Sequence, residues 1–540
     1  MGLETELGAA IETRDRFEPV DAVIASRLVE LIAEQYSPGG ACAESRGTRF
    51  FLPSGDCVYP DIGNHPELVT RECRTPRQVL AADMALRHAA AEAGAMLSAN
   101  DGVSLTLFAN SRDWGGTPYG CHENYLSWGT TSITGLTRAL MPHLLTRIVF
   151  TGSGMIDLAS PGGFQLSQRA DSMRQITGSN RSHDADERPF VDTRNESLSG
   201  DARQCRIHVS SGEANLLQLP TYLKLGTTAC LVAMIDQGWE LPPRLHIDDP
   251  TLAFQTISRD LSLQGRIGPS KLRAIDVQFE ILAEAKKWFA QGRLEPFGDA
   301  SETRRVLRDW ERVVAALDHD PESAVGLVDW VTRRAFLDEY ASRQDLTADA
   351  PVLQALSLRL EELPRPGSVS DRFHRWRPVD CERVLDPERI DLTGATQVVG
   401  TRADVRANAI RQLHPIVVGA NWSELRLALG DGEYSLPLTD PIDDSGSGLA
   451  QARTYEDALR AAARCMLAHC DTHIDEPQPF HERRSLVVGA GRILGRTPEV
   501  IAAVSKLQDR WPHEAERVSL RFESIPRRGM VGAVDRSITD

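Results

Sequence analysis

Residues 59–72 read YPDIGNHPELVTRE, and this stretch concentrates polar side chains around one turn. The pattern predicts a strand over 57–61, so Tyr59 and Asp61, two positions apart, face the same side. Glu67 and Glu72 follow on the segment after the turn. Isolated acidic residues are most often solvated surface groups, but this close spacing makes a functional site the competing interpretation.

A second acidic run, Glu4-Thr5-Glu6, lies near the start of the chain. Residues 1–12 alternate loosely and predict a strand with Glu4 and Glu6 on one face. Carboxylates on extended segments, with no cysteine–histidine cage beside them, suit a hard cation such as Mg²⁺ that also binds phosphate oxygens. A remaining carboxylate can then act as a base beside the metal. We therefore expect the chemistry where these two acidic runs meet.

The composition is that of an ordinary globular protein. The 540 residues are 41% hydrophobic and 25% charged, which is enough to bury a large core in two or three domains. A formal net charge of −16 argues against a general nucleic-acid binder. The nine cysteines lack disulfide spacing, and we see no signal peptide or long apolar span. We expect a cytoplasmic protein with reduced thiols and no membrane partner.

Periodicity and turn residues divide the chain into elements and modules. They predict a helix opening at Pro19, a helix capped by Thr75 and Gln78 that runs to about Leu97, a buried helix over 220–237, helices through 270–346, and strands at 48–52, 57–61 and 103–109. Linkers are predicted at Glu361–Val369 and Asp440–Gly448. The expected domains are an α+β catalytic body at 1–365, a small module at 370–440, and a helical extension at 450–540.

Several further motifs have both a functional and a structural interpretation. In the run 119–125, a backbone-bonded His122 in a turn is the favoured interpretation; if the run is extended, His122 and Glu123 face opposite sides. Segments 167–169 and 206–208 each place an arginine on an expected strand, either as a phosphate-binding residue or as one partner of an ordinary ion pair. Trp422 either stacks on a nucleobase or belongs to the core. A group in the extension lacks recognised zinc spacing and is not assigned as a metal site: Cys465, His469, Cys470 and His473.

Taken together, the motifs resemble the family of Pup ligase and Pup deamidase/depupylase, relatives of glutamine synthetase and carboxylate–amine ligases. The matching pieces run in family order over about residues 1–440: GLETELG at 2–8, YPDIGNHPELVTREC at 59–73, YGCHENYL at 119–126, SQRAD at 167–171, DTRNE at 192–196, RIHV at 206–209, YLKLGTTA at 222–229 and Trp422. The resemblance implies a glutamine-synthetase-like fold, in which a curved antiparallel sheet with packed helices cradles ATP and Mg²⁺ and the small C-terminal module closes one end.

The resemblance also implies residue roles. Glu4, Tyr59 and Glu67 match the magnesium-binding positions, and Asp61 matches the catalytic base. Thr70 and Trp422 match nucleotide-binding positions, and Arg206 and His208 of the RIHV segment are assigned to the same cofactor site. Two departures stand out: Cys57 replaces an ATP-binding arginine of the family, and the segment DTRNESLSGD at 192–201 differs from the family's NTRDEPHAD.

Two enzymatic directions follow from this family. A ligase phosphorylates a carboxylate, usually that of the C-terminal Glu of the small protein Pup, and a lysine amine deprotonated by Asp61 attacks the acyl phosphate. A deamidase or depupylase hydrolyses a side-chain amide at the same site. GNHPE and YGCHENYL resemble the ligase branch, FQLSQRAD and YLKLGTTA the hydrolase branch, and only 37–47 is available for the inserted loop of the hydrolases. We favour the ligase.

Two other interpretations remain. A diverged ligase would join an amine to a peptide or small molecule, which the altered 192–201 segment and the extension would explain. A non-catalytic nucleotide-binding module would keep the pocket as a scaffold. Retention of every proposed metal ligand and of the base argues against this last interpretation.

Overall fold

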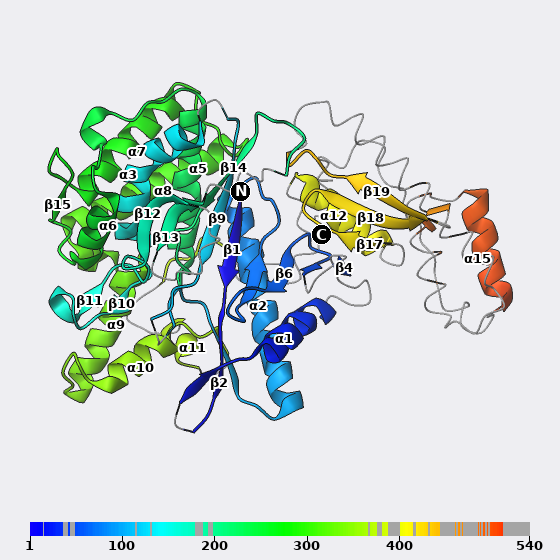
Figure 1. The fold of residues 1–540 in the computed structure, drawn as a ribbon, viewed down its shortest axis with the longest axis horizontal. Coiled ribbons are helices and arrows are strands. Elements are labelled where there is room, and N and C mark those ends of the chain that lie inside the picture. The colour runs from blue at the N-terminus through cyan, green and yellow to red at the C-terminus, as the bar shows by residue number, and fades with distance from the viewer. Residues whose placement is uncertain are drawn as a thin grey trace, which may run out of the picture. The chain divides into compact units, whose positions relative to one another are not determined.

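The computed structural model describes most of residues 1–365 and parts of the remainder (Figure 1). The described residues are 1–14, 16–35, 42–43, 49–113, 116–129, 132–178, 187–192, 198–365, 368–374, 381–386, 400–413, 417–429, 432–442 and 497–510, with single residues between 460 and 494. They form two compact units. The first contains 1–31, 59–197 and 202–394, and the second contains 32–58, 198–201 and 395–540.

A single sheet organises the first unit, with neighbouring strands in the order β12-β13-β14-β9-β1-β7 (Figure 1). These strands pair antiparallel except β12 and β13, which are parallel, so the predicted antiparallel sheet is confirmed with one exception. The strands of this nine-stranded sheet that lie wholly in the first unit are β1 (Gly2–Glu6), β7 (Pro66–Val69), β9 (Cys121–Ser127), β12 (Met173–Gly178), β13 (Arg188–Asp192) and β14 (Cys205–Val209).

Short strands flank this sheet. The ribbon β3-β2-β8 extends from the chain after β1, and two small hairpins lie among the helices. Their bounds are β2 (Gly8–Glu12), β3 (Phe17–Pro19), β8 (Leu105–Phe108), β10 (Met155–Ile156), β11 (Phe164–Gln165), β15 (Arg266–Ile267) and β16 (Leu272–Arg273).

Helices cover one face of the sheet. The helix α2 packs on β1, β7 and β8, while α5 packs on β9 and is itself covered by α3, α7 and α8 (Figure 1). The helices of this unit are α1 (Ala22–Glu34), which runs into the second unit, α2 (Pro76–Asp101), α3 (Ile133–Thr146), α4 (Ile148–Thr151), α5 (Gln218–Asp236), α6 (Pro250–Arg259), α7 (Ala274–Ala290), α8 (Ala300–His319), α9 (Asp329–Gln344), α10 (Pro351–Arg359) and α11 (Val369–His374), with single 3₁₀ turns at Pro161–Gly163, Pro243–Leu245 and Pro321–Ala324.

The capping signals of α2 are confirmed. The Thr75 side chain accepts a hydrogen bond from the Gln78 amide, the Gln78 side chain accepts from the Thr75 amide, and Pro76 is the first helical residue. The helix ends at Gly102, whose φ of 67° is the left-handed conformation that glycine adopts without strain. It therefore extends one turn beyond the predicted end at Leu97.

Pro19 does not open a helix. It ends β3, where it pairs with Ala10, and α1 begins three residues later. The residue that starts this helix is Asp21, whose carboxylate accepts a hydrogen bond from the Ile24 amide at 2.9 Å. The capping carboxylate decides the start here, because proline suits both a strand end and a first helical turn.

The beginning of the predicted linker at 361–369 belongs to the folded body. Glu361 is buried, and its carbonyl accepts a hydrogen bond from the Ala109 amide at 2.8 Å. Its carboxylate lies 2.5 Å from Arg333 and accepts hydrogen bonds from Gln168 and Asn110. Glu361 therefore fastens this segment to the folded body, although the sequence EELPRP resembles a linker. The proposed domain limits stay a prediction.

The described part of the second unit contains a three-stranded antiparallel sheet, β17-β18-β19, together with short strands and helices. Its elements are β4 (Cys42–Ala43), β5 (Phe50–Phe51), the first half of β6 (Cys57–Pro60), α12 (Arg402–Leu413), β17 (Val417–Ala420), β18 (Glu424–Leu429), β19 (Gly432–Pro437) and α15 (Pro498–Arg510). Phe50 pairs with Val58 around the predicted turn, which confirms that hairpin. Arg411 donates to the Pro53 carbonyl at 2.6 Å and so ties α12 to the same turn.

Little of the C-terminal extension is described. The helix α15 buries Val500, Ala503 and Leu507 on one face, so it packs as an amphipathic helix. Cys465, His469, Cys470 and His473 lie outside the described residues, as do most of 37–47 and of 192–197. Within the described part of the chain, no helix is both long and apolar enough to cross a membrane.

Candidate active site

Strand alternation sorts the side chains of the sheet onto two faces. Glu4 and Glu6 of β1 share the face opposite the helices, whereas Thr5 points to α2 and donates to Asp83 at 3.0 Å. The register places Glu6 opposite Glu67 of β7 and Glu4 opposite His122 of β9. The two acidic runs that lie some sixty positions apart in the sequence are therefore brought together, as predicted.

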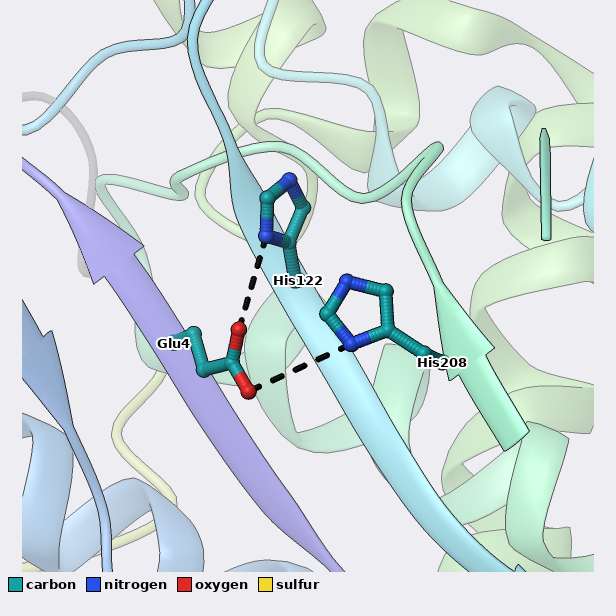
Figure 2. Close-up of side chains that lie close together, drawn as sticks. All are labelled: Glu4, His122 and His208. Atoms are coloured by element: carbon teal, nitrogen blue, oxygen red, sulfur yellow. Dashed lines mark ion pairs between the residues drawn. The ribbon is translucent and has the colours of Figure 1, made fainter. Parts of the chain in front are cut away.

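Two histidines and an asparagine surround Glu4 (Figure 2). Nδ1 of His122 lies 3.6 Å from Glu4 Oε2, and Nδ1 of His208, from β14, lies 4.0 Å from Glu4 Oε1. Asn124 donates to Glu4 at 2.8 Å, and its amide oxygen lies 3.1 Å from His208 Nδ1. The ligand atoms of Glu4, His122 and His208 all lie within 4.8 Å of one another, so this group is able to hold a metal ion.

Several carboxylates are crowded together at this face. Burial raises the pKa of Glu67 well above its usual value, and the neighbouring carboxylates of Glu4, Glu6 and Asp61 raise it further. Burial also raises the pKa of Asp61, with Glu6 adding to the effect. Like charges held this close favour a divalent cation between them, and the oxygen-rich donor set fits Mg²⁺.

The pKa values of Glu4 and His208 are both lowered, so that Glu4 is charged and His208 is neutral at neutral pH. Burial would raise the pKa of Glu4, yet His208, His122 and Arg206 together lower it below the usual carboxyl range. Burial lowers the pKa of His208 to about 3. At neutral pH the anion of Glu4 thus faces a neutral imidazole, and both are the forms that bind cations.

Asp61 lies near this group, since the charges of Glu6 and His122 both act on its carboxyl group. It directly follows β6 and is half-buried on a short loop before β7. Tyr59, on the preceding strand, makes a side-chain hydrogen bond with Glu67. The structure therefore brings Tyr59, Asp61 and Glu67 together with Glu4, which is the set that the sequence analysis proposed.

Arg206 and His208 share the site face of β14, because they are two residues apart on that strand. Arg206 Nη1 lies 4.0 Å from Glu4 Oε1. Arg206 Nε and His208 Nε2 are buried and make no hydrogen bond within the described part of the chain. The Arg206 N–H is therefore available to a bound anion, and the acceptor nitrogen of the neutral His208 is available to a cation or to a donor group of a nucleotide.

Thr70 has a structural contact that the sequence did not reveal. Its hydroxyl accepts a hydrogen bond from the Leu3 amide at 2.9 Å, and its own amide donates to the Leu3 carbonyl at 2.9 Å. Thr70 is buried beside the end of β7. It anchors β1 against β7, and its nucleotide-binding role stays a prediction.

Trp422 belongs to the second unit and is half-buried there. Its ring meets Phe51 edge-on at 5.0 Å, and the guanidinium of Arg406 lies 5.0 Å from its centroid. Arg406 also donates to the Trp422 carbonyl at 3.2 Å. The indole is thus packed and partly accessible at once, so stacking on a nucleobase stays a prediction.

His122 is the main residue that the sequence interpretation placed wrongly. It was expected in a turn with a backbone partner, but it lies within β9 and faces the carboxylates of Glu4 and Glu6. The prediction that His122 and Glu123 face opposite sides, given an extended segment, is confirmed, since Glu123 pairs with Arg147 on the helix side. The alternation of side chains between the two faces of the strand CHENYLS, residues 121–127, is the sequence signal that places His122 on the site face.

The arginine of the 167–169 segment also differs from expectation. Arg169 follows β11 rather than lying on a strand, and its buried guanidinium donates to the Tyr119 carbonyl. Gln168 donates to Glu361 at 2.6 Å, and Ser167 bonds to Glu213. The three side chains therefore fasten this segment to the body.

Comparison with known proteins gives a consistent result. The family model described as Pup-ligase protein matches residues 1–426. The depupylase of Acidothermus cellulolyticus is 30% identical over 451 residues, 81% of this chain and 87% of that protein. The Pup–protein ligase of Corynebacterium efficiens is 33% identical over 392 residues, 68% and 76% of the two chains.

Solved structures agree with this. The complex between the prokaryotic ubiquitin-like protein Pup and its ligase PafA superposes with a TM-score of 0.71 at 26% identity, covering 90% of this chain and 96% of that chain. PafA in complex with ADP gives a TM-score of 0.65 at 27% identity, covering 82% and 96%. These matches confirm the glutamine-synthetase-like α+β fold. The chain belongs to the Pup-ligase family.

Proposed function

We propose that this protein is an ATP- and Mg²⁺-dependent carboxylate–amine ligase that joins a Pup-like small protein, through its C-terminal Glu, to lysines of other proteins. The observation that carries the proposal is the gathering of Glu4, Glu6 and Glu67 on one face of the sheet with Asp61 beside them. Relatives named Pup–protein ligase and the PafA structures with Pup and with ADP support the same activity. The partners would be the Pup-like protein and its protein acceptors, with no nucleic acid or membrane.

The reaction would proceed in two steps. The donor's carboxylate oxygen attacks the γ-phosphorus of ATP, which gives an acyl phosphate and ADP. The lysine amine then attacks the acyl carbon, phosphate leaves, and the amine proton passes to Asp61. Glu4, Tyr59 and Glu67 would hold Mg²⁺, and the bound ion would neutralise negative charge on the phosphoryl group.

The remaining site residues would bind and orient. Arg206 offers an N–H that has no partner among the described residues, which suits contact with phosphate oxygens, and the neutral His208 on the same face offers an acceptor nitrogen that suits a cation or a donor group of the nucleotide. Thr70 and Trp422 would bind the nucleotide. Cys57 is a buried thiol and cannot carry a positive charge, so it does not replace the charge of the family arginine. Use of ATP and cysteines in the reduced thiol form both agree with a cytoplasmic location.

Amide hydrolysis is the second candidate, because the depupylase of Acidothermus cellulolyticus is among the most similar relatives. The same carboxylates would then hold the metal and Asp61 would assist attack on a side-chain amide. Ligase and hydrolase differ in what they consume. A ligase turns over ATP with each bond formed, whereas a hydrolase releases ammonia or a lysine amine.

The deciding experiment supplies ATP, Mg²⁺ and an amine-bearing protein with a Pup-like protein ending in Glu or in Gln. Ligation predicts a conjugate and stoichiometric ADP with the Glu form. Hydrolysis predicts ammonia from the Gln form and loss of a preformed conjugate. ATP binding with no conjugate, ammonia or ADP from either form would instead support the non-catalytic module.

A further inference from the structure

The loop that carries Asp61 is a tight turn between β6 and β7. The Asp61 amide donates to the His65 carbonyl at 2.8 Å, and the Asn64 amide donates to the Asp61 carbonyl at 3.1 Å. Gly63 and Asn64 both have positive φ, 86° and 63°, and Ile62 at the tip is 75% exposed. The turn holds its own shape, but its tip lies in solvent, so its placement depends on the side chains at its base.

His65 is the side chain that fastens this base. Its Nδ1 lies 3.0 Å from the Leu7 carbonyl, and because a carbonyl only accepts, Nδ1 carries the proton. The Leu7 amide in turn donates to the Pro66 carbonyl at 2.9 Å. Leu7 directly follows Glu6, so the imidazole ties the Asp61 loop to the strand that bears the acidic ligands.

The imidazole also rests on a fixed aromatic ring. The rings of His65 and Tyr119 stack with centroids 4.3 Å apart and planes 30° apart. Tyr119 is buried and donates its hydroxyl to Asn110, whose amide donates to Glu361 at 2.8 Å. Glu361 is held by Arg333. A continuous buried chain therefore fixes the surface on which His65 lies.

We propose that His65, held between the Leu7 carbonyl and the Tyr119 ring, is a positioning residue that sets the place of Asp61 against the substrate amine. This inference rests on the proposed function, in which Asp61 takes the amine proton. His65 need not touch any reacting atom. A proton acceptor displaced by about 1 Å loses up to about 100-fold in rate, so a small shift of this loop has a large catalytic effect.

The test compares His65→Ala with His65→Phe, which keeps a ring on Tyr119 but loses the bond to Leu7. We expect His65→Ala to lower kcat by about 10- to 100-fold while the KM for ATP and the calorimetric ATP affinity stay within about twofold. His65→Phe should retain more activity than His65→Ala. His88→Ala, an exposed histidine on α2, is the matched control and should match the parent.

Hydrogen exchange gives a readout that does not depend on activity. Amides of 61–65 should exchange faster in His65→Ala than in the parent or in His88→Ala. Tyr119→Phe, which loses only the bond to Asn110, should show a smaller change in both exchange and kcat.

Unchanged exchange in this loop, or kcat within about twofold of the parent, would overturn the positioning role. A parallel loss of melting temperature and ATP affinity in both His65 variants would show a purely structural role and would overturn it as well. A parent chain that makes no conjugate and releases no ammonia would refute the proposed function instead, and loop exchange would still decide whether His65 fixes the Asp61 turn.

Discussion

His122 and Glu123 are neighbours on β9, yet they face opposite sides of the sheet and meet opposite electrostatic environments. On the helix side, Glu123 accepts two hydrogen bonds from Arg147, at 2.5 and 2.8 Å, and a third from Tyr125. On the other side, His122 lies beside the carboxylates of Glu4 and Glu6, and Glu67, opposite Glu6, adds a third carboxyl group whose pKa the other two raise.

This difference separates structural charges from functional ones. A buried ion pair that is fully hydrogen-bonded needs no ligand, because each charge is already compensated. A group of like charges is held by the fold at a cost, and a bound cation with its phosphate ligands would remove that cost. Burial alone therefore does not identify the active site, since both faces bury ionisable groups.

The strongest test of the site face is Asp61→Asn. The substitution keeps the shape of the side chain but removes the proton acceptor, so conjugate formation should fall by about 10²- to 10⁴-fold. Calorimetry on the same preparation should find nearly unchanged ATP binding. Activity within about tenfold of the parent would remove Asp61 from the role of base.

The helix face should respond in stability instead. Arg147→Met leaves Glu123 buried without its partner and should lower the free energy of unfolding by about 3–5 kcal/mol, measured by urea titration. In the double variant Glu123→Gln with Arg147→Met, much of that loss should return because no charge remains buried. Equal losses in the single and double variants would show that packing, rather than the unpaired charge, dominates.

Glu67→Gln should produce a smaller, metal-dependent effect. Loss of one anionic oxygen should raise the Mg²⁺ concentration for half-maximal activity by about tenfold or more. Because the same change relieves repulsion among the carboxylates, the metal-free protein should become no less stable. Glu72→Gln, at the other end of the same motif, is the control, and an unchanged Mg²⁺ requirement in Glu67→Gln would place the metal elsewhere.

The smallest predicted effect concerns His143 on the helix face. Burial, with the nearby charge of Arg147, lowers the pKa of His143 well below its usual 6.5. As the pH falls through about 6.5, His143 becomes protonated in the unfolded chain but stays neutral in the folded chain. The free energy of unfolding therefore contains the full contribution of neutral His143 above pH 6.5 and loses it as the pH falls. Between pH 6.5 and 5.5 the loss should be about 1 kcal/mol.

Comparing unfolding at those two pH values in the parent and in His143→Gln isolates this contribution. Gln keeps a side chain able to bond with Thr228 and Gln278, the present partners of the imidazole. The variant should lose less stability on acidification than the parent does. An identical pH dependence would mean that other groups account for the slope.

Local patterns predicted many of the elements correctly. The capping box at Thr75 and Gln78, the hairpin around residues 53–56 and the shared face of Glu4 and Glu6 all follow from short-range geometry. Pro19 and the 361–369 segment were misplaced because their composition suits two outcomes. For Glu361 the outcome depended on Arg333, a partner 28 positions away that no local pattern could name.

The sequence by itself determined the alternation of each strand and the ordered motifs, and hence the family and the residues that we propose as acidic ligands and as base. Those features depend on residue type and on spacing along one segment. Only the tertiary structure decided which strands lie side by side. The register of β1 between β7 and β9 put His122 and Asn124 beside Glu4, and the stacking of His65 on Tyr119 fixed the Asp61 loop. Such contacts join residues tens of positions apart, so their energies are set by packing and register rather than by any local preference.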